Sequence, residues 1–123
     1  MNIVDSSGWL EYFAQGSNAG YFAPIIRETQ SLVVPTICMY EVFKRILIQR
    51  GEEKALQAIG VMSLGTTADL TQEIAINAAQ ISSELKIAMA DSMILATARK
   101  YNAVLWTQDI DFEGLSAVRY IPK

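Results

Sequence analysis

The sequence contains no histidine and a single cysteine, Cys38. Without histidine the chain lacks the commonest general base, and serine–histidine and cysteine–histidine nucleophile pairs are excluded. A lone cysteine cannot form an intramolecular disulfide, so a reducing compartment, the cytoplasm, is expected. Any catalysis must therefore depend on carboxylates, hydroxyls, lysines or a bound metal ion.

Long apolar runs are also absent. No stretch approaches the roughly 20 apolar residues that span a bilayer, and the N-terminus lacks the basic start and apolar run of a signal peptide, so no membrane association is expected. The 123 residues are nevertheless 51% hydrophobic, with a mean hydropathy of +0.22. This length predicts a single domain over residues 1–123. The apolar surplus predicts a face shared between subunits or with a partner protein, which we expect on the helical regions 8–26 and 41–65.

Positive charge is not in excess either, because 10 basic residues stand against 13 acidic ones and the net charge is −3. An acidic balance ordinarily argues against a nucleic-acid partner. If four of the 13 acids surrounded a metal ion, however, nine would remain against the 10 bases. Net charge alone therefore does not decide the partner.

Short, nearly unbroken apolar runs alternate with helical patterns along the chain. The sequence predicts strands at 2–5, 31–34, 103–107 and 117–121, and a short strand or turn at 66–71. It predicts helices at 6–15, 21–30, 52–65, 72–86 and 92–102, one more from Pro35 to a stop at Gly51, and a loop or short turn at 108–115. This alternation is typical of an α/β fold with a parallel sheet covered on both faces, in which ligands bind at the carboxyl ends of the strands.

Several acids lie near the predicted strand ends, where the carboxyl edge of such a sheet would be. Asp5 follows the first strand, and Asp109 and Asp111 follow the strand at 103–107. Asp91 precedes a predicted helix, and Glu41 lies inside an otherwise apolar helical segment. Carboxylates from distant parts of the chain are therefore candidates for one shared site.

Each acid taken singly has another interpretation. Asp5 and Asp91 are good N-caps, each worth about 1 kcal/mol to its helix. Glu41 would pair on the helix surface with a base three or four residues on, and Asp109 would serve in a turn.

Together, the acids can share one site only if a cation offsets their mutual repulsion. Two carboxylates about 5 Å apart repel by roughly 3 kcal/mol at an effective dielectric near 20, so several of them together need a cation. Oxygen donors without histidine favour a hard ion, Mg²⁺ or Mn²⁺, over zinc. Such an ion orients a water, lowers its pKa and offsets charge on a phosphodiester.

The same residues lie in segments that resemble the motifs of a known family. VDSSGWLEYF contains Asp5, PTICMYEVFKRI contains Glu41, and MADSMILATARKYNAVLWTQDIDFEGL contains Asp91 and Asp109. These segments resemble, in order and over essentially the whole chain, the four motifs of PIN-domain ribonucleases of the VapC type. VapC proteins are the toxins of type II toxin–antitoxin pairs.

The resemblance implies a PIN fold, a twisted and mainly parallel sheet flanked by helices. It implies a Mg²⁺- or Mn²⁺-dependent endoribonuclease in which a metal-activated water attacks phosphorus in line. The implied catalytic and metal-binding residues are Asp5, Glu41, Asp91 and Asp109. Asp111 is a fifth candidate, because family members differ in whether this acid reaches the metal. Ser6 and Thr107 would hold waters or hydrogen-bond to the metal ligands.

The resemblance also implies partners, namely RNA, a second copy of the chain and an antitoxin that covers the acidic groove. The candidate RNA-binding bases are Lys44, Arg45, Arg50, Lys86, Arg99 and Lys100, with ordinary solvated helix faces as the alternative. Two other functions stay open at this point. One is a PIN nuclease of RNA processing or quality control, and the other is a metal-binding interaction module without catalysis.

Overall fold

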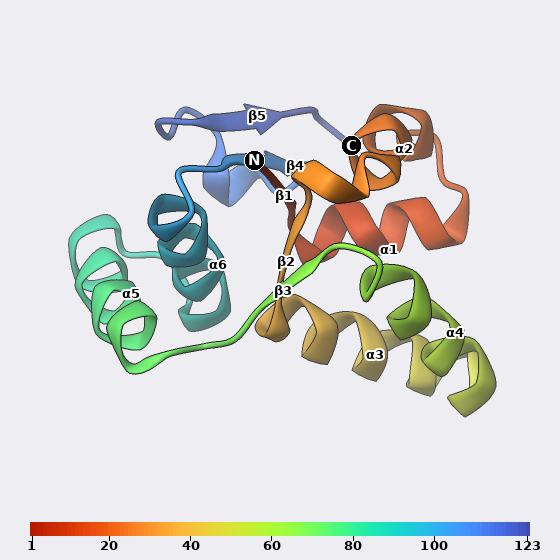
Figure 1. The fold of residues 1–123 in the computed structure, drawn as a ribbon. Helices are drawn as coiled ribbons and strands as arrows, with labels where there is room; N and C mark the ends of the chain where they lie inside the picture. The colour runs from red at the N-terminus through yellow and green to blue at the C-terminus, as the bar shows by residue number, and fades with distance from the viewer.

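The computed structural model describes all residues, Met1–Lys123. Two helices follow each of the first three strands, and the last two strands are joined by a short 3₁₀ turn (Figure 1). The strands are β1 (Asn2–Val4), β2 (Val33–Pro35), β3 (Thr66–Ala68), β4 (Val104–Thr107) and β5 (Val118–Tyr120). The α-helices are α1 (Ser6–Ala14), α2 (Ala19–Arg27), α3 (Thr36–Arg50), α4 (Glu52–Met62), α5 (Gln72–Leu85) and α6 (Met89–Lys100), and the 3₁₀ turns are η1 (Thr29–Ser31) and η2 (Ile110–Phe112).

Every strand pairing is parallel. β1 pairs with β4 and β4 with β5, while β2 pairs with β3. A parallel bridge between Asn2 and Leu32 joins the two ladders, so the strands follow the order β3–β2–β1–β4–β5. The carboxyl ends of β1 and β4 therefore lie side by side in the middle of the sheet. The predicted parallel α/β architecture is confirmed.

The sheet is buried because helices cover both of its faces. Consecutive residues point to opposite faces of a strand, and Ile3 and Val4 of β1 and Val33 and Val34 of β2 are all inaccessible to solvent. This is why the strands read as unbroken apolar runs rather than as alternating patterns. In Figure 1, α5 and α6 form one helical pair on the left, and α1 to α4 pack on the right.

Helix ends agree with local capping rules at several places. The carboxylate of Asp5 accepts a hydrogen bond from Gly8 N–H and caps α1. Thr71 caps α5 through Ile74 N–H at 3.2 Å. Gly51, with φ +92°, ends α3 in a conformation that favours glycine.

The prediction that Asp91 precedes and caps its helix is wrong. Helix α6 begins at Met89, so Asp91 lies in its first turn and Ala88 is the N-cap. The extended backbone at Ala88 starts the helix there, and its carbonyl accepts from Ser92 N–H at 2.9 Å. The Asp91 carboxylate is thereby free of a capping role.

Other boundaries differ by a few residues. Helix α2 begins two residues before the predicted start and ends at Arg27, where η1 follows. Strand β2 is Val33–Pro35 rather than 31–34, and α4 ends at Met62. The segment left open as strand or turn forms strand β3. Pro35 belongs to β2 and is the N-cap of α3.

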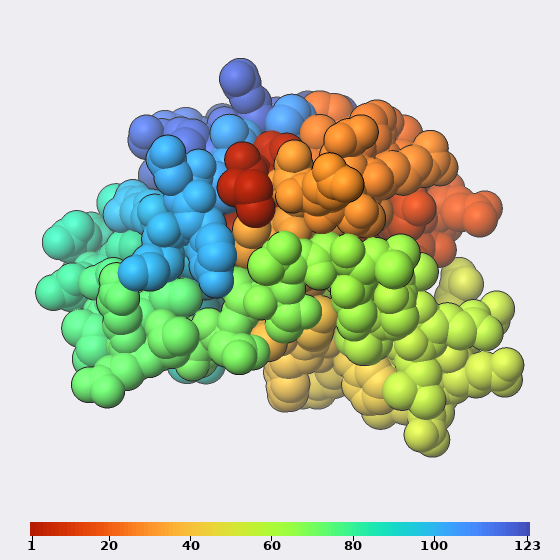
Figure 2. All heavy atoms as spheres, viewed as in Figure 1, coloured from red at the N-terminus to blue at the C-terminus, as the bar shows by residue number.

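The space-filling view shows the N-terminal end of the chain (red) at the surface between the region from α6 to β4 and the region from α2 to β2 (Figure 2). No helix of the chain is long and apolar enough to cross a membrane.

Candidate metal centre

The four acids that the sequence singled out line one groove, of about 780 Å³, between α1, α3, α4 and α6. Asp5 comes from the end of β1 and Asp109 from the turn after β4, two neighbouring strand ends. Glu41 reaches the groove from the second turn of α3, and Asp91 from the first turn of α6. Segments far apart in sequence therefore supply one acidic site.

Asp5 is the most buried of the acids, with 2% of its surface exposed. Its Oδ1 accepts from Ser7 Oγ at 2.7 Å and Gly8 N–H at 3.0 Å, and its Oδ2 accepts from Thr107 Oγ1 at 2.7 Å. Burial raises the pKa of Asp5 to about 6, although these hydrogen bonds lower it. The carboxylate is fixed in place, and its charge is costly without a nearby cation.

Both hydroxyl residues that the sequence predicted as supports touch an acid. Ser6 Oγ donates to Glu41 Oε1 at 2.6 Å, which joins the start of α1 to α3. Thr107 Oγ1 donates to Asp5 and accepts from the Asp109 backbone N–H at 2.9 Å. These hydroxyls therefore hold three of the four acids in relation to one another.

Asp91 is the centre of the unbalanced charge. Burial, followed by the charges of Asp109, Asp5, Glu41 and Asp111, raises its pKa to about 7. No hydrogen bond contributes to that shift, so its oxygens are left for another ligand. Three carboxylates from this region, Asp91, Asp109 and Asp111, have oxygens within 4.8 Å of one another.

The donor set fits a hard divalent cation. All its members are carboxylate oxygens, which suit Mg²⁺ and Mn²⁺, and no imidazole or accessible thiolate is present to favour zinc. Asp91 has no side-chain hydrogen bond, and Asp109 accepts one through Oδ1, from Asp111 N–H at 3.0 Å, so both carboxylates keep an oxygen for an ion in the groove. Asp111, the fifth candidate, is in this group although it is exposed.

The PIN domain family model matches residues 3–117 of the chain. The chain belongs to the PIN domain family. The fold agrees, since a toxin–antitoxin complex from Klebsiella pneumoniae contains a chain with TM-score 0.81 and 22% identity, aligned over 97% of this chain and 96% of that one. The resemblance to PIN domains seen in the motifs is confirmed by the family model, and the expected PIN fold by the structural similarity.

Two further structures share this PIN fold. DNA-bound VapBC from Salmonella typhimurium has TM-score 0.75 and 20% identity, over 99% of this chain and 98% of that one. VapC20 from Mycobacterium tuberculosis, a toxin that cleaves the sarcin–ricin loop, has TM-score 0.75 and 15% identity, over 97% and 99% of the two chains. No curated protein sequence matches this PIN domain.

Two residues of the acidic site were not predicted from the sequence. Ser7 hydrogen-bonds to Asp5, and its position at the second residue of a helix capped by Asp5 was the available signal. Gln108 stands between two motif residues, Thr107 and Asp109, and is 7% exposed. A polar side chain this well buried needs partners, and those of Gln108 lie on segments distant in sequence.

Basic side chains also line the groove of this PIN domain. They are Arg45, Arg50, Lys54 and Lys123. Arg45 and Arg50 follow Glu41 by four and nine residues on α3, which places them about 6 and 14 Å along the helix axis. The groove therefore runs from clustered acids toward a basic region.

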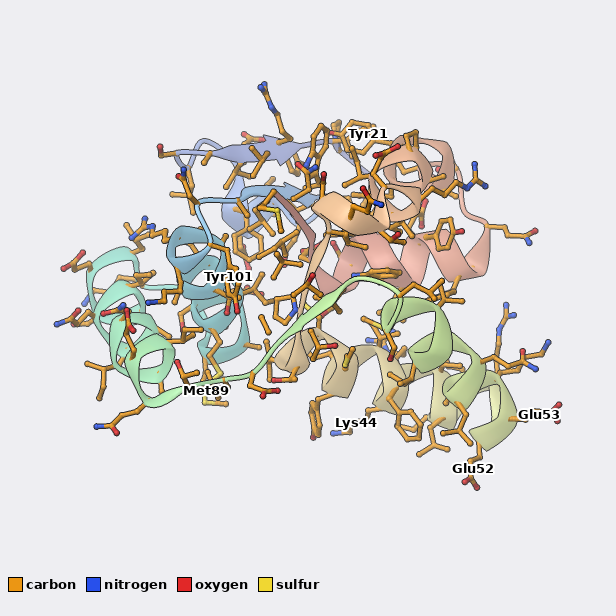
Figure 3. The ribbon with its side chains drawn as sticks, viewed as in Figure 1. Tyr21, Lys44, Glu52, Glu53, Met89 and Tyr101 are labelled. Carbon is orange, nitrogen blue, oxygen red and sulfur yellow. The ribbon has the colours of Figure 1, made fainter.

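The other predicted bases lie elsewhere. Figure 3 shows Lys44 at the outer edge of α3, and its Nζ lies 5.7 Å from the centre of the Tyr40 ring. Lys100 pairs with Glu73 at 3.0 Å in an exposed salt bridge. Arg99 borders a small cavity between α5 and α6, and Lys86 ends α5 in a left-handed conformation. Of the five bases other than Arg50, only Arg45 lines the acidic groove.

Cys38 lies close to the acids but has no chemical role in nucleophilic attack. It is fully buried, and burial strongly raises the pKa of its thiol, an effect to which the charges of Asp5, Glu41 and Asp91 add. The thiol therefore stays protonated at neutral pH, and the weakly nucleophilic SH group excludes a covalent cysteine mechanism.

Proposed function

We propose that this PIN domain is a Mg²⁺- or Mn²⁺-dependent endoribonuclease and the toxin of a toxin–antitoxin pair. The observation that carries the proposal is that Asp5, Glu41, Asp91 and Asp109 converge on one groove of a PIN fold. Asp111 is added as a fifth, outer acid, because its carboxylate lies with those of Asp91 and Asp109.

The side chains would have different roles, according to how firmly hydrogen bonds hold each of them. Asp91 and Asp109 would hold the cation with the oxygens that accept no hydrogen bond, which in Asp109 is Oδ2, while Thr107 and Ser7 keep Asp5 in a single orientation. Ser6 would orient Glu41 in the same way. The metal, when bound, would act as a Lewis acid that activates water and offsets phosphodiester charge. Hydrolysis by water would leave a 3′-hydroxyl and a 5′-phosphate.

An RNA strand is the substrate that the groove supports best. Its phosphates would contact the basic region that begins with Arg45 and Arg50, while one phosphodiester reaches the acids. The chain as a whole is acidic, but the acids are gathered where a cation would neutralise them. RNA would be recognised by the shape of single-stranded loops rather than through the hydrolytic chemistry.

An antitoxin would occupy the same groove. Besides acids and bases, the groove is lined by the apolar side chains of Leu10, Phe13, Ile46 and Val61. A peptide with apolar and charged residues would therefore cover it. Toxin chains of the same fold occur in complexes from Klebsiella pneumoniae and Salmonella typhimurium, which supports this partner.

A homodimer in the cytoplasm completes the proposal. Helix α3 exposes Tyr40, Leu47 and Ile48, none of which lines the groove, and Ile48 is 73% exposed. Apolar side chains at such spacing favour contact with another protein surface. Sedimentation of the purified chain at micromolar concentration tests this, and a monomer would contradict the dimer.

The nuclease proposal is tested by comparing the wild type with Asp91→Asn on total RNA, with and without Mg²⁺ or Mn²⁺, and mapping new 5′ ends. We expect metal-dependent cleavage by the wild type and a loss of at least about 100-fold in the variant. Asp69→Asn, an exposed acid outside the groove, is the matched control. Equal cleavage by wild type and Asp91→Asn would overturn the assignment, and metal binding without any cleavage would favour an interaction module. Cleavage without growth arrest on expression would favour a processing nuclease.

A further inference from the structure

Asn18 occupies the N-cap position of α2 but does not cap that helix. An asparagine in this position normally accepts a hydrogen bond from the first turn. Instead, its Nδ2 donates to Gln108 Oε1 and to the Pro122 carbonyl, both at 3.0 Å. These partners are 90 and 104 residues away in sequence. The Asn18 side chain therefore makes long-range hydrogen bonds instead of capping its own helix.

The turn that carries Asn18 is itself tightly held. Its backbone N–H donates to Glu11 Oε2 at 2.8 Å, and Gln15 ends α1 with φ 55°. A Cβ on Gly16 would collide with the Glu11 carboxylate, so the turn packs closely around that side chain. The amide group of Asn18 is consequently presented from a rigid position.

Gln108 lies between the segment that carries Asp5 and the turn that carries Asp109. Its Nε2 approaches the Ser7 carbonyl at 3.4 Å, and its backbone N–H approaches Ser7 Oγ at the same distance. Ser7 Oγ in turn donates to Asp5, while Asp109 is the next residue after Gln108. A movement of Gln108 would therefore change the relation between Asp5 and Asp109.

We propose that Asn18 and Gln108 are positioning residues that set the relative placement of Asp5 and Asp109. This role rests on the metal centre proposed above. The acids repel one another when no cation is present, and Asp109 lies in the turn between β4 and η2, outside regular secondary structure. The Asn18–Gln108 hydrogen bond ties this turn to the rigid turn before α2, so less reorganisation is needed when a cation binds.

The same Asn18 amide also holds the C-terminal segment through Pro122, and the next residue, Lys123, lines the groove. The two hydrogen bonds of one NH₂ group therefore have separable consequences. Removing Gln108 frees only the turn at Asp109, whereas removing Asn18 frees both that turn and the segment with Lys123. We expect Gln108→Ala to weaken cation binding alone, and Asn18→Ala to weaken cation binding and raise KM for RNA.

The experiment is a calorimetric Mn²⁺ titration of the wild type, Asn18→Ala, Gln108→Ala and the double variant. Each single variant should lose about tenfold in Mn²⁺ affinity, as is usual when a residue behind a metal ligand is removed. The double variant should lose no more than the weaker-binding single variant, because the two residues act as one unit. Excess Mn²⁺ should restore kcat in Gln108→Ala. Asn77→Ala, an exposed asparagine on α5, is the control.

Thermal melting of each variant separates positioning from folding. If Ala variants melt early, Asn18→Asp keeps the shape of the side chain but replaces two donors with acceptors, and it should still lose Mn²⁺ affinity. Wild-type affinity in folded Asn18→Ala and Gln108→Ala, or additive losses in the double variant, would overturn the positioning role. Failure of the wild type to bind Mn²⁺ would instead overturn the metal centre itself.

Discussion

The hydroxyl of Thr107 donates to Asp5 Oδ2 at 2.7 Å and so links the carboxyl ends of the two central strands. The same oxygen accepts from the backbone N–H of Asp109 at 2.9 Å. One fully buried side chain therefore positions two acids of the groove, one by its side chain and the other by its backbone.

Replacing Thr107 by valine keeps the volume of the side chain but removes both hydrogen bonds. We expect Mn²⁺ affinity to fall about tenfold or more and the free energy of unfolding to fall by about 1–3 kcal/mol, because buried polar groups lose their partners. Calorimetry and chemical denaturation measure the two effects. Thr97→Val is the matched control, since Thr97 is equally buried but bonds within α6 to the Met93 carbonyl. A similar loss of Mn²⁺ affinity in the control would contradict the specific role of Thr107.

Asp91→Asn should make the metal-free protein more stable at pH 8. The substitution removes a charge that is repelled by Asp109, Asp5 and Glu41, and we expect a gain of about 1 kcal/mol after screening at this half-exposed position. Urea denaturation in the presence of a chelator measures the gain. Asp69→Asn should leave stability unchanged, and a destabilised Asp91→Asn protein would argue against clustered repulsion.

The stability of the metal-free protein should fall as the pH rises from about 4 to about 7. The pKa of Asp5 is raised from 3.8 to about 6 and that of Asp91 from 3.8 to about 7, so in this range the folded state holds protons that the unfolded chain has released. The raised pKa of Asp5 corresponds to a loss of about 3 kcal/mol in the free energy of unfolding once this carboxyl is ionised.

Denaturation at pH 5, 6, 7 and 8 tests this dependence. The advantage of Asp91→Asn over the wild type should grow with pH and level off near pH 8, and saturating Mn²⁺ should reduce it. A constant difference across this range would show that Asp91 does not titrate with a raised pKa.

Arg45→Ala and Arg50→Ala should weaken RNA binding without a comparable loss of kcat. If RNA follows the proposed path, each variant removes one phosphate contact in the groove, so the slope of log Kd against log salt should decrease by about 0.7. We expect KM to rise about three- to tenfold. Arg99→Ala, on the far side of α6 beside α5, is the control. An equal effect in the control would indicate general charge attraction instead of a path along the groove.

Gly8→Ala should destabilise the protein by about 1–3 kcal/mol through overpacking. A Cβ there would lie 2.6 Å from Val4 Cγ1 and 2.8 Å from the Phe22 ring, between β1 and α2. Gly60→Ala is the opposite case, because α4 leaves open space around it, and helix propensity predicts a gain of up to about 1 kcal/mol. Thermal melting distinguishes the two, and a neutral Gly8→Ala would mean that Phe22 moves aside easily.

The parallel sheet and the acidic groove could be predicted from the sequence because local signals agreed with the fold. Apolar runs such as SLVV and AVLWT are long enough for buried strands, and acids lie at the ends of two of the strands, Asp5 directly after the first and Asp109 two residues after AVLWT. The start of α6 was mispredicted because Asp91 is the best capping residue in its segment, whereas the backbone at Ala88 begins the helix without a side-chain cap.

Contacts between side chains far apart in the sequence could not be predicted, because no local pattern marks them. Asn18 looks like an ordinary N-cap, and its bond to Gln108 joins residues 90 positions apart. The sequence also does not show which surface bases face the groove. Lys44 and Arg45 are neighbours in sequence, but only Arg45 lines the groove. Such features depend on how helices are rotated in the assembled fold, which a single sequence does not specify.

The position of β1 in the sheet also determines when the groove can exist. Asn2 is synthesised well before its partner Val104, and the acids of the groove include Asp109. Contacts between such distant segments form late, because a long loop must close first. A nascent chain that has emerged only as far as α5 carries Asp5 and Glu41 but no central strand pair to bring them beside their partners. The acidic groove therefore cannot form until β4 and the turn that carries Asp109 have been synthesised.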